Sequence, residues 1–412
     1  MRFFHLSDLH LGKSIHGLSL LDSGDQEYWM EQFIALAEKV RPDAVVIAGD
    51  IYDRSAPSGE AVKLLDRMLT ALAAQGIPVF LIAGNHDSGQ RLSFAADLLA
   101  KQNVHIAGTL SRELKHVTLQ DEYGPVTFWM MPYLFPALVS HVLENEEIRD
   151  YNTAVRCLLE VQNIDFSQRN VIIAHQNVTA NGAEGERGGS ETMVGGVGQV
   201  DVTVFDGFDY VALGHIHAAY PVGRETVRYA GSPLCYHFNE TRQAQKGPLL
   251  VTLRDRGSTP GIETLSIPPL HPMREVQGTF DELRSAELVS QKKGEYLKIV
   301  LTDQRVSPQI AEFFHSLYDE RGSVLLELAS EYDAFTGKTN ALDAKAVREK
   351  TVEDLFADFY QERNGGVPLT DNDTALLAYA GELLRHADLR MAPQKQDIEK
   401  LLKTLMEQEE RR

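Results

Sequence analysis

Short runs of β-branched and aromatic residues recur along the first two thirds of the chain. Each run has the length of a buried strand, and together they predict strands at 2–6, 44–48, 78–83, 126–131, 170–174, 209–213, 227–230 and 248–253. Between the early runs, residues 26–40 and 58–74 carry apolar side chains at helical spacing. This alternation predicts an α/β layered domain with a sheet buried on both faces. The later strands lack long intervening helices, which predicts a mixed second sheet packed on the first.

A cluster of prolines between positions 268 and 272 predicts a domain boundary, because proline breaks regular structure. Beyond it the pattern predicts strands at 274–280, 296–301 and 324–329 and a helix at 308–318, which would form a small α+β unit. A polar linker at 334–345 and a tail with two or three amphipathic helices follow. The expected domains are therefore 1–270, 271–335 and 336–412.

Composition narrows the class of protein. The 412 residues include 40 Lys and Arg against 59 Asp and Glu, a net charge of −19, which argues against gripping nucleic acid by bulk charge. Cys157 and Cys235 lie far apart, which excludes a disulfide scaffold and favours a reduced, cytoplasmic setting. The opening MRFFHLSDLH is too polar for a signal peptide. No apolar run approaches the ~20 residues of a membrane span, so no membrane association is expected.

Polar motifs follow five of the predicted strands directly. They are SDLH after the first strand, GDIYD after the second, GNHD after the third, a single His after the 170–174 strand, and GHIH after the 209–213 strand. Ligands of open α/β sheets bind outside the carboxyl ends of strands, so we expect these side chains at one rim. Each motif alone is weak evidence for a functional site, although GNHD is stronger than the others. All five motifs in this order form a specific signal. The candidate residues are Asp8, His10, Asp50, Asp53, Asn85, His86, His175, His215 and His217.

Carboxylate, amide oxygen and imidazole are the ligand types that borderline divalent metals such as manganese accept together. The set is large enough for two metals that share one carboxylate. Two cations would neutralise the charge of a phosphodiester, and an imidazole titrates close enough to neutral pH to protonate a leaving alkoxide. The residue types therefore indicate metal-assisted phosphoester hydrolysis.

The ordered motifs resemble the signature of the calcineurin-like metallophosphoesterases. Within that superfamily, HLSDLHLG, GDIYDRSAPS, YVALGHIH and RYAGSP are most similar to the double-strand-break-repair nuclease family. The resemblance is strong over residues 1–240 and covers the rest only by layout. It implies a two-sheet α/β sandwich flanked by helices, a small α+β capping domain that guides DNA, and a helical C-terminal tail.

The resemblance also implies a role for each candidate ligand. Two Mn²⁺ ions are expected, with Mg²⁺ as a possible substitute. The implied ligands are Asp8, His10 and His217 for one ion and Asn85, His175 and His215 for the other, with Asp50 bridging the two.

Two further residues have implied catalytic roles. His86 matches the proton donor to the leaving oxygen. Asp53 is placed like the carboxylate that orients this His in phosphatases of the superfamily, whereas archaeal and eukaryotic nuclease relatives usually have His there. Asp87 is expected to anchor the loop.

The family resemblance implies a DNA nuclease subunit for repair, recombination and replication. Its activities would be exonucleolytic on duplex ends and endonucleolytic on single-stranded or hairpin DNA. The tail would dock a coiled-coil ABC-type ATPase, and the chain would form a homodimer within a heterotetramer. The apolar segments 62–72 and 92–99 fit either a core or that homodimer, and the tail fits either the ATPase or the chain's own body.

Other interpretations of the sequence stay open. A phosphatase or cyclic-nucleotide phosphodiesterase shares the fold, but protein phosphatases have DRG where this chain has Asp53-Arg54-Ser55. A non-catalytic scaffold would lack ligands, and none is missing. The glycine-rich segment 180–200 suits a loop that admits a DNA strand or a plain surface loop. Three lysines, Lys292, Lys293 and Lys298, either meet phosphates or face solvent.

Overall fold

The computed structural model describes residues 1–180, 198–242, 245–284, 294–320 and 322–331. The chain divides into two units, Met1–Tyr332 and Asp333–Arg412, and all described residues belong to the first. Most of the glycine-rich segment, Lys292, Lys293, the linker and the predicted tail helices lie outside the described residues.

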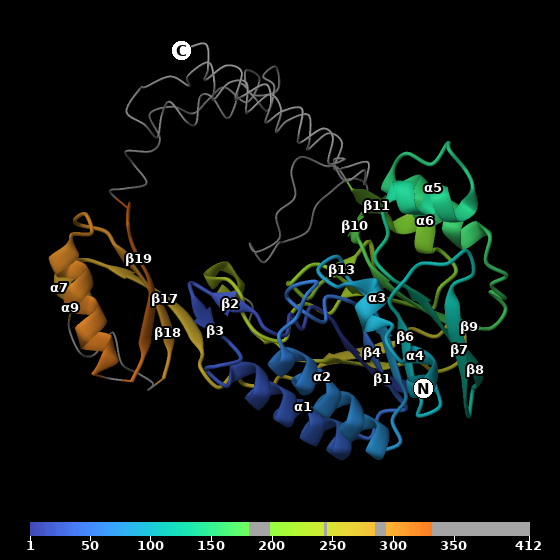
Figure 1. Cartoon of the computed structure of the whole chain (residues 1–412), viewed down its shortest axis with the longest axis horizontal. Helices are drawn as coiled ribbons and strands as arrows, with labels where there is room; N and C mark the ends of the chain where they lie inside the picture. Colours follow the sequence, from blue (N-terminus) through green and yellow to red (C-terminus); the bar gives the residue numbers. More distant parts are fainter. Residues whose placement is uncertain (181–197, 243–244, 285–293, 321, 332–412) are drawn as a thin grey trace, which may run out of the picture. The chain divides into compact units, whose positions relative to one another are not determined.

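The first sheet has the strand order β16-β15-β1-β4-β5-β6. Its parallel strands are β1 (Arg2–Leu6), β4 (Ala44–Ile47), β5 (Val79–Ile82) and β6 (Val104–Ala107). Two antiparallel strands, β15 (Leu249–Thr252) and β16 (Gly261–Thr264), complete it. Two long helices, α1 (Asp25–Val40) and α2 (Gly59–Ala74), pack against its outer face (Figure 1).

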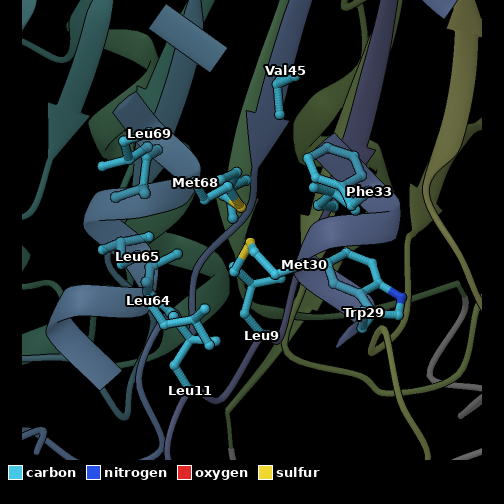
Figure 2. Packing of buried hydrophobic residues seen from close by; sticks show 14 of the residues in the cluster. Leu9, Leu11, Trp29, Met30, Phe33, Val45, Leu64, Leu65, Met68 and Leu69 are labelled. Carbon is cyan, nitrogen blue, oxygen red and sulfur yellow. The ribbon is translucent and has the colours of Figure 1, made fainter. Parts of the chain in front are cut away.

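Alternate residues of these strands serve two different cores, as the two-residue repeat of a strand requires. Val45 packs with Phe33 of α1 and Met68 of α2 in the outer core (Figure 2). Its neighbour Val46 faces the second sheet. Ser58 begins α2 as an N-cap, because its hydroxyl accepts a hydrogen bond from the backbone N–H of Ala61.

The second sheet has the order β13-β14-β12-β9-β8-β7. Its strands are β7 (Lys115–Asp121), β8 (Gly124–Met131), β9 (Arg169–His175), β12 (Tyr210–Gly214), β13 (Pro221–Val222) and β14 (Arg224–Tyr229). Helices α5 (Pro136–Leu143) and α6 (Tyr151–Glu160) contribute to the core on its outer face. Between the sheets lies a fully buried layer that includes Phe3, Val46, Phe80, Phe128, Ile173 and Tyr210.

The predicted two-sheet α/β sandwich with flanking helices is confirmed. The pattern missed α5, α6 and the edge strands β6, β7, β13 and β16. The apolar segment 92–99 is not one helix but parts of two, α3 (Gly89–Leu92) and α4 (Ala96–Ala100). Phe94, between the two helices, is 83% exposed, and Leu98, on α4, is 66% exposed. The segment 62–72 lies in α2, whose buried face belongs to the outer core.

Shorter elements connect the main ones. They are β2 (Ser14–Ile15), β3 (Leu18–Ser19), β10 (Asn177–Thr179), β11 (Gln199–Asp201) and the 3-10 turns η1 (Val202–Phe205) and η2 (Phe238–Arg242). Among the described residues, no helix combines the length and the apolar character that a membrane crossing needs.

The small α+β unit has a core of its own. Its elements are β17 (Met273–Gly278), α7 (Phe280–Leu283), β18 (Tyr296–Leu301), α9 (Pro308–Asp319) and β19 (Val324–Ser330), and its three strands run parallel. Leu297, Phe314 and Tyr318 are fully buried between the sheet and α9. Lys298 pairs with Glu275 and Glu327 at 3.4 and 3.1 Å, so this lysine is already engaged by carboxylates.

Candidate metal centre

The carboxyl ends of strands from both sheets meet at one rim of the sandwich. The first sheet supplies Asp8 and His10 after β1, Asp50 after β4, and Asn85 and His86 after β5. The second sheet supplies His175 at the end of β9 and His215 and His217 after β12. Neighbouring parallel strands end at the same edge, so residues from distant parts of the chain come together.

The backbone at this rim is strained where the motifs leave the strands. Asp8, His10, Asp50 and His215 have positive φ angles of 53°, 41°, 49° and 99°. Such angles are uncommon for residues other than glycine and concentrate at functional sites.

Two glycines allow this close packing. A Cβ on Gly84 would lie 2.1 Å from Asp50 Oδ1, and one on Gly49 would lie 2.4 Å from His175 Nδ1. A side chain at either position would clash with these atoms, so the GDIYD and GNHD motifs require glycine there.

The first ligand cluster consists of Asp8, His10 and His217. These buried residues offer ligand atoms within 4.8 Å of one another. The Nε2 atoms of His10 and His217 are 3.2 Å apart. The other ring nitrogen of His217, Nδ1, lies 3.4 Å from Glu240 Oε1 and can only donate to that carboxylate, which leaves Nε2 as a ligand atom.

The second cluster is built around Asn85. Its Oδ1 lies 3.0 Å from both His175 Nε2 and His215 Nδ1. His175 Nδ1 donates to the Ala48 carbonyl at 2.7 Å, which directs Nε2 into the site. Asp50 lies between the clusters, with Oδ2 3.5 Å from His10 Nε2 and 3.3 Å from His175 Nε2.

Burial and mutual charge govern the titration of these groups. Burial would raise the pKa of Asp50, but the neighbouring His175 and His10 hold it well below its usual range. Burial opposes protonation of His175, but Asp50 raises its pKa to about 9. Burial and nearby His175 lower the pKa of His215 to about 3. Two buried carboxylates that face imidazoles and the amide oxygen of the exposed Asn85 fit two borderline divalent cations, with Asp50 shared.

His86 is exposed at the edge of the cluster. Its backbone N–H donates to Asp50 Oδ1 at 2.9 Å, and its ring lies edge-on to that of His10. Its Nδ1 is 2.9 Å from the backbone carbonyl of Asp53. The Asp53 carboxylate instead binds Lys13 Nζ at 2.8 Å and lies 3.5 Å from His10 Nδ1. The contact between Asp53 and the His86 ring therefore runs through the main chain, which the residue types do not reveal.

The Asp87 carboxylate joins two of the motif loops. It accepts hydrogen bonds from the backbone N–H groups of Gly84, Ile51 and Tyr52 at 2.9, 3.0 and 2.9 Å. These bonds fix the GNHD loop against the GDIYD loop.

The sequence did not single out the buried groups behind the first cluster. Glu240 and Lys246 lie next to His217, and the Tyr236 hydroxyl donates to the backbone carbonyls of Asp8 and Leu9 at 3.2 and 2.7 Å. They follow the RYAGSP phrase, but no metal-type spacing marks them.

Comparisons with known proteins define the class of this chain. The model of the calcineurin-like phosphoesterase family matches residues 1–219, more than half of the chain, and these residues contain every candidate ligand. The chain belongs to this family of metal-dependent phosphoesterases. A second family model, described as the type 5 capsule protein repressor C-terminal domain, matches residues 269–364.

A curated relative narrows the family. The chain is 31% identical over 306 residues to the D subunit of nuclease SbcCD from Staphylococcus saprophyticus subsp. saprophyticus, and the match covers 73% of this chain and 78% of the relative. The chain therefore belongs to the family of SbcD nuclease subunits, and the predicted nuclease family is confirmed.

Two solved structures are also similar. A protein of Thermus thermophilus is 12% identical, and the match covers 64% of this chain and 98% of that protein, with a TM-score of 0.37. A dimetal phosphatase from Danio rerio is 14% identical, with coverage of 65% and 99% and also a TM-score of 0.37. At this TM-score the likeness indicates nothing about function.

Proposed function

We propose that this chain is a Mn²⁺-dependent DNA nuclease subunit, exonucleolytic on duplex ends and endonucleolytic on single-stranded and hairpin DNA. The observation that supports this most is the convergence of two ligand clusters on Asp50 at the rim of the sandwich. The relative named as a nuclease subunit favours DNA as the substrate. Roles in DNA repair, recombination and replication and a cytoplasmic location belong to the same proposal.

The proposed ligand sets follow the two clusters. Asp8, His10 and His217 would hold one ion, Asn85, His175 and His215 the other, and Asp50 both. Mn²⁺ accepts this mixture of ligands, and Mg²⁺ is a possible substitute. When bound, the ions stabilise charge on the phosphodiester and lower the pKa of an attacking water.

His86 would donate a proton to the leaving oxygen. Its exposure at the rim gives it access to substrate, and the hydrogen bond between Nδ1 and the Asp53 carbonyl leaves Nε2 as the nitrogen available for proton transfer. The Asp53 carboxylate would affect the reaction only indirectly, because it contacts Lys13 and lies near His10. Asp53 is thus proposed as a positioning residue.

The acidity of the chain fits a division of labour with a partner. Two divalent ions would bring four positive charges against the carboxylates of Asp8 and Asp50, so phosphate would be attracted locally although the net charge is −19. Holding long duplex DNA would fall to a more basic coiled-coil ABC ATPase of the SbcC type, docked by the helices that the sequence predicts within 336–412. We propose residues 1–270 as the nuclease domain and 271–335 as the capping domain, with the chain as a homodimer in a heterotetramer.

A metallophosphoesterase for small phosphoesters or phosphoproteins is the alternative. One assay with Mn²⁺ separates the two, with a labelled hairpin DNA, a cyclic nucleotide and a phosphomonoester compared at equal concentration. The proposal predicts cleavage of the hairpin and its loss with a chelator. Cleavage of the small substrates alone would contradict it.

A further inference from the structure

A buried ion pair lies directly behind the first ligand cluster. Glu240 is fully buried, and its Oε2 lies 2.9 Å from Lys246 Nζ. Lys246 Nζ also donates to the His217 carbonyl at 3.0 Å and to Ser232 Oγ at 2.7 Å. A buried ion pair is costly unless further hydrogen bonds satisfy both charges, and here they do.

The two carboxylate oxygens of Glu240 have different partners. Oε2 is held by Lys246, by the Ser232 hydroxyl at 3.2 Å and by the Tyr236 backbone N–H at 3.2 Å. Oε1 points to His217 Nδ1 at 3.4 Å. Because Oε2 faces an ammonium and two further donors, Glu240 is the acceptor in its contact with His217.

We infer that Glu240, fixed by Lys246, positions the His217 imidazole as a ligand of the first ion. The carboxylate selects the Nδ1–H tautomer, holds the ring plane and directs Nε2 toward His10, 3.2 Å away. Lys246 holds the same residue at its main chain, so ring and backbone of His217 are fixed by one ion pair. This inference rests on the proposed metal site and adds to it two residues outside the ligand set.

The second cluster has a different arrangement, which makes the inference selective. His175 Nδ1 donates to a backbone carbonyl, that of Ala48, whereas His217 Nδ1 faces the carboxylate of Glu240. Loss of the Glu240 charge should therefore weaken only the ion at Asp8, His10 and His217. A general structural role for Glu240 would affect both ions and the fold together.

The test is a Mn²⁺ titration of the full-length protein, with free Mn²⁺ followed by electron paramagnetic resonance. The variants are Glu240→Gln and the double variant Glu240→Gln/Lys246→Met, which avoids leaving a buried unpaired ammonium. Glu295→Gln is the matched control, because Glu295 is also a buried carboxylate, paired with Arg274 at 2.6 Å in the small α+β unit. Urea unfolding in chelator measures the metal-free fold of each variant.

Wild-type and Glu295→Gln proteins should bind two ions. Both Glu240 variants should keep one ion at wild-type affinity and bind the other about 10- to 100-fold more weakly. In the double variant, this loss should occur with the metal-free stability close to that of wild type. Two ions at wild-type affinity in Glu240→Gln, or equal weakening of both, would overturn the inference alone. A wild-type protein that binds no pair of ions would overturn the proposed site as well.

Discussion

His10 and His217 approach each other to 3.2 Å between their Nε2 atoms, although 207 positions separate them in the chain. His10 follows β1 of the first sheet and His217 follows β12 of the second. The first ligand cluster therefore forms only when the two sheets pack correctly, and a cation held there would join the two layers.

Replacing His86 by alanine should abolish most turnover and leave metal binding intact. Loss of a general acid typically costs about 10²- to 10⁴-fold in rate. The measurement is the rate of hairpin cleavage, together with the number of Mn²⁺ ions bound.

His86 also lies within 4.8 Å of His10 and Asp50 through its potential ligand atoms, so a ligand role is a real rival. A variant that binds one ion fewer would support that rival. A variant with the wild-type rate would exclude the proton-donor role.

Gly84→Ala should disable the metal site by a steric clash alone. The new Cβ would overlap Asp50 Oδ1, so the shared carboxylate would have to move. We expect the loss of at least one bound Mn²⁺ and a fall in activity of about 100-fold or more, since small misplacement at a reacting centre has such effects.

Gly59→Ala is the control for this change. Gly59 begins α2, and a Cβ at this position would meet no atom within 4 Å. The free energy of unfolding of the Gly59→Ala protein should therefore stay within about 0.5 kcal/mol of wild type. If Gly84→Ala binds two ions as well as Gly59→Ala does, the site does not depend on the space at Gly84.

Deletion of residues 346–412 should prevent association with an SbcC-type ATPase. The nuclease domain would remain, so Mn²⁺-dependent cleavage of single-stranded DNA should persist. A pull-down with the ATPase, beside the cleavage assay, measures both. Retained association would refute the docking role of the tail.

The proposed homodimer has a candidate surface around α4. Phe94 and Leu98 are strongly exposed there. The double variant Phe94→Glu/Leu98→Glu should therefore shift the protein from a dimer to a monomer. Light scattering after size-exclusion chromatography gives the mass. Val161→Glu, at a 40% exposed apolar position after α6, should leave the mass unchanged. A dimer that persists in the Phe94 and Leu98 variant would place the interface elsewhere.

The sequence predicted the central strands because they are continuous apolar runs, and the long helices because their apolar residues recur at helical spacing. All four edge strands of the large sheets were missed. β7 and β16 alternate between more exposed and less exposed positions, and β13 has only two residues, so neither length nor apolar content marks them.

The ligand motifs were visible because each follows its strand within a few residues. The supports of the site were not visible in the same way. Glu240 contacts His217 across a 23-residue separation, and Asp53 reaches the His86 ring with a main-chain oxygen. Neither relationship follows from residue type or spacing, because both depend on how the loops after the strands fold back.

The most direct test of the proposed two-metal site is anomalous diffraction from a crystal of the protein grown with Mn²⁺. We predict two peaks, one beside Asp8, His10 and His217 and one beside Asn85, His175 and His215, with Asp50 in contact with both. A single peak, or peaks away from these side chains, would contradict the two-metal site.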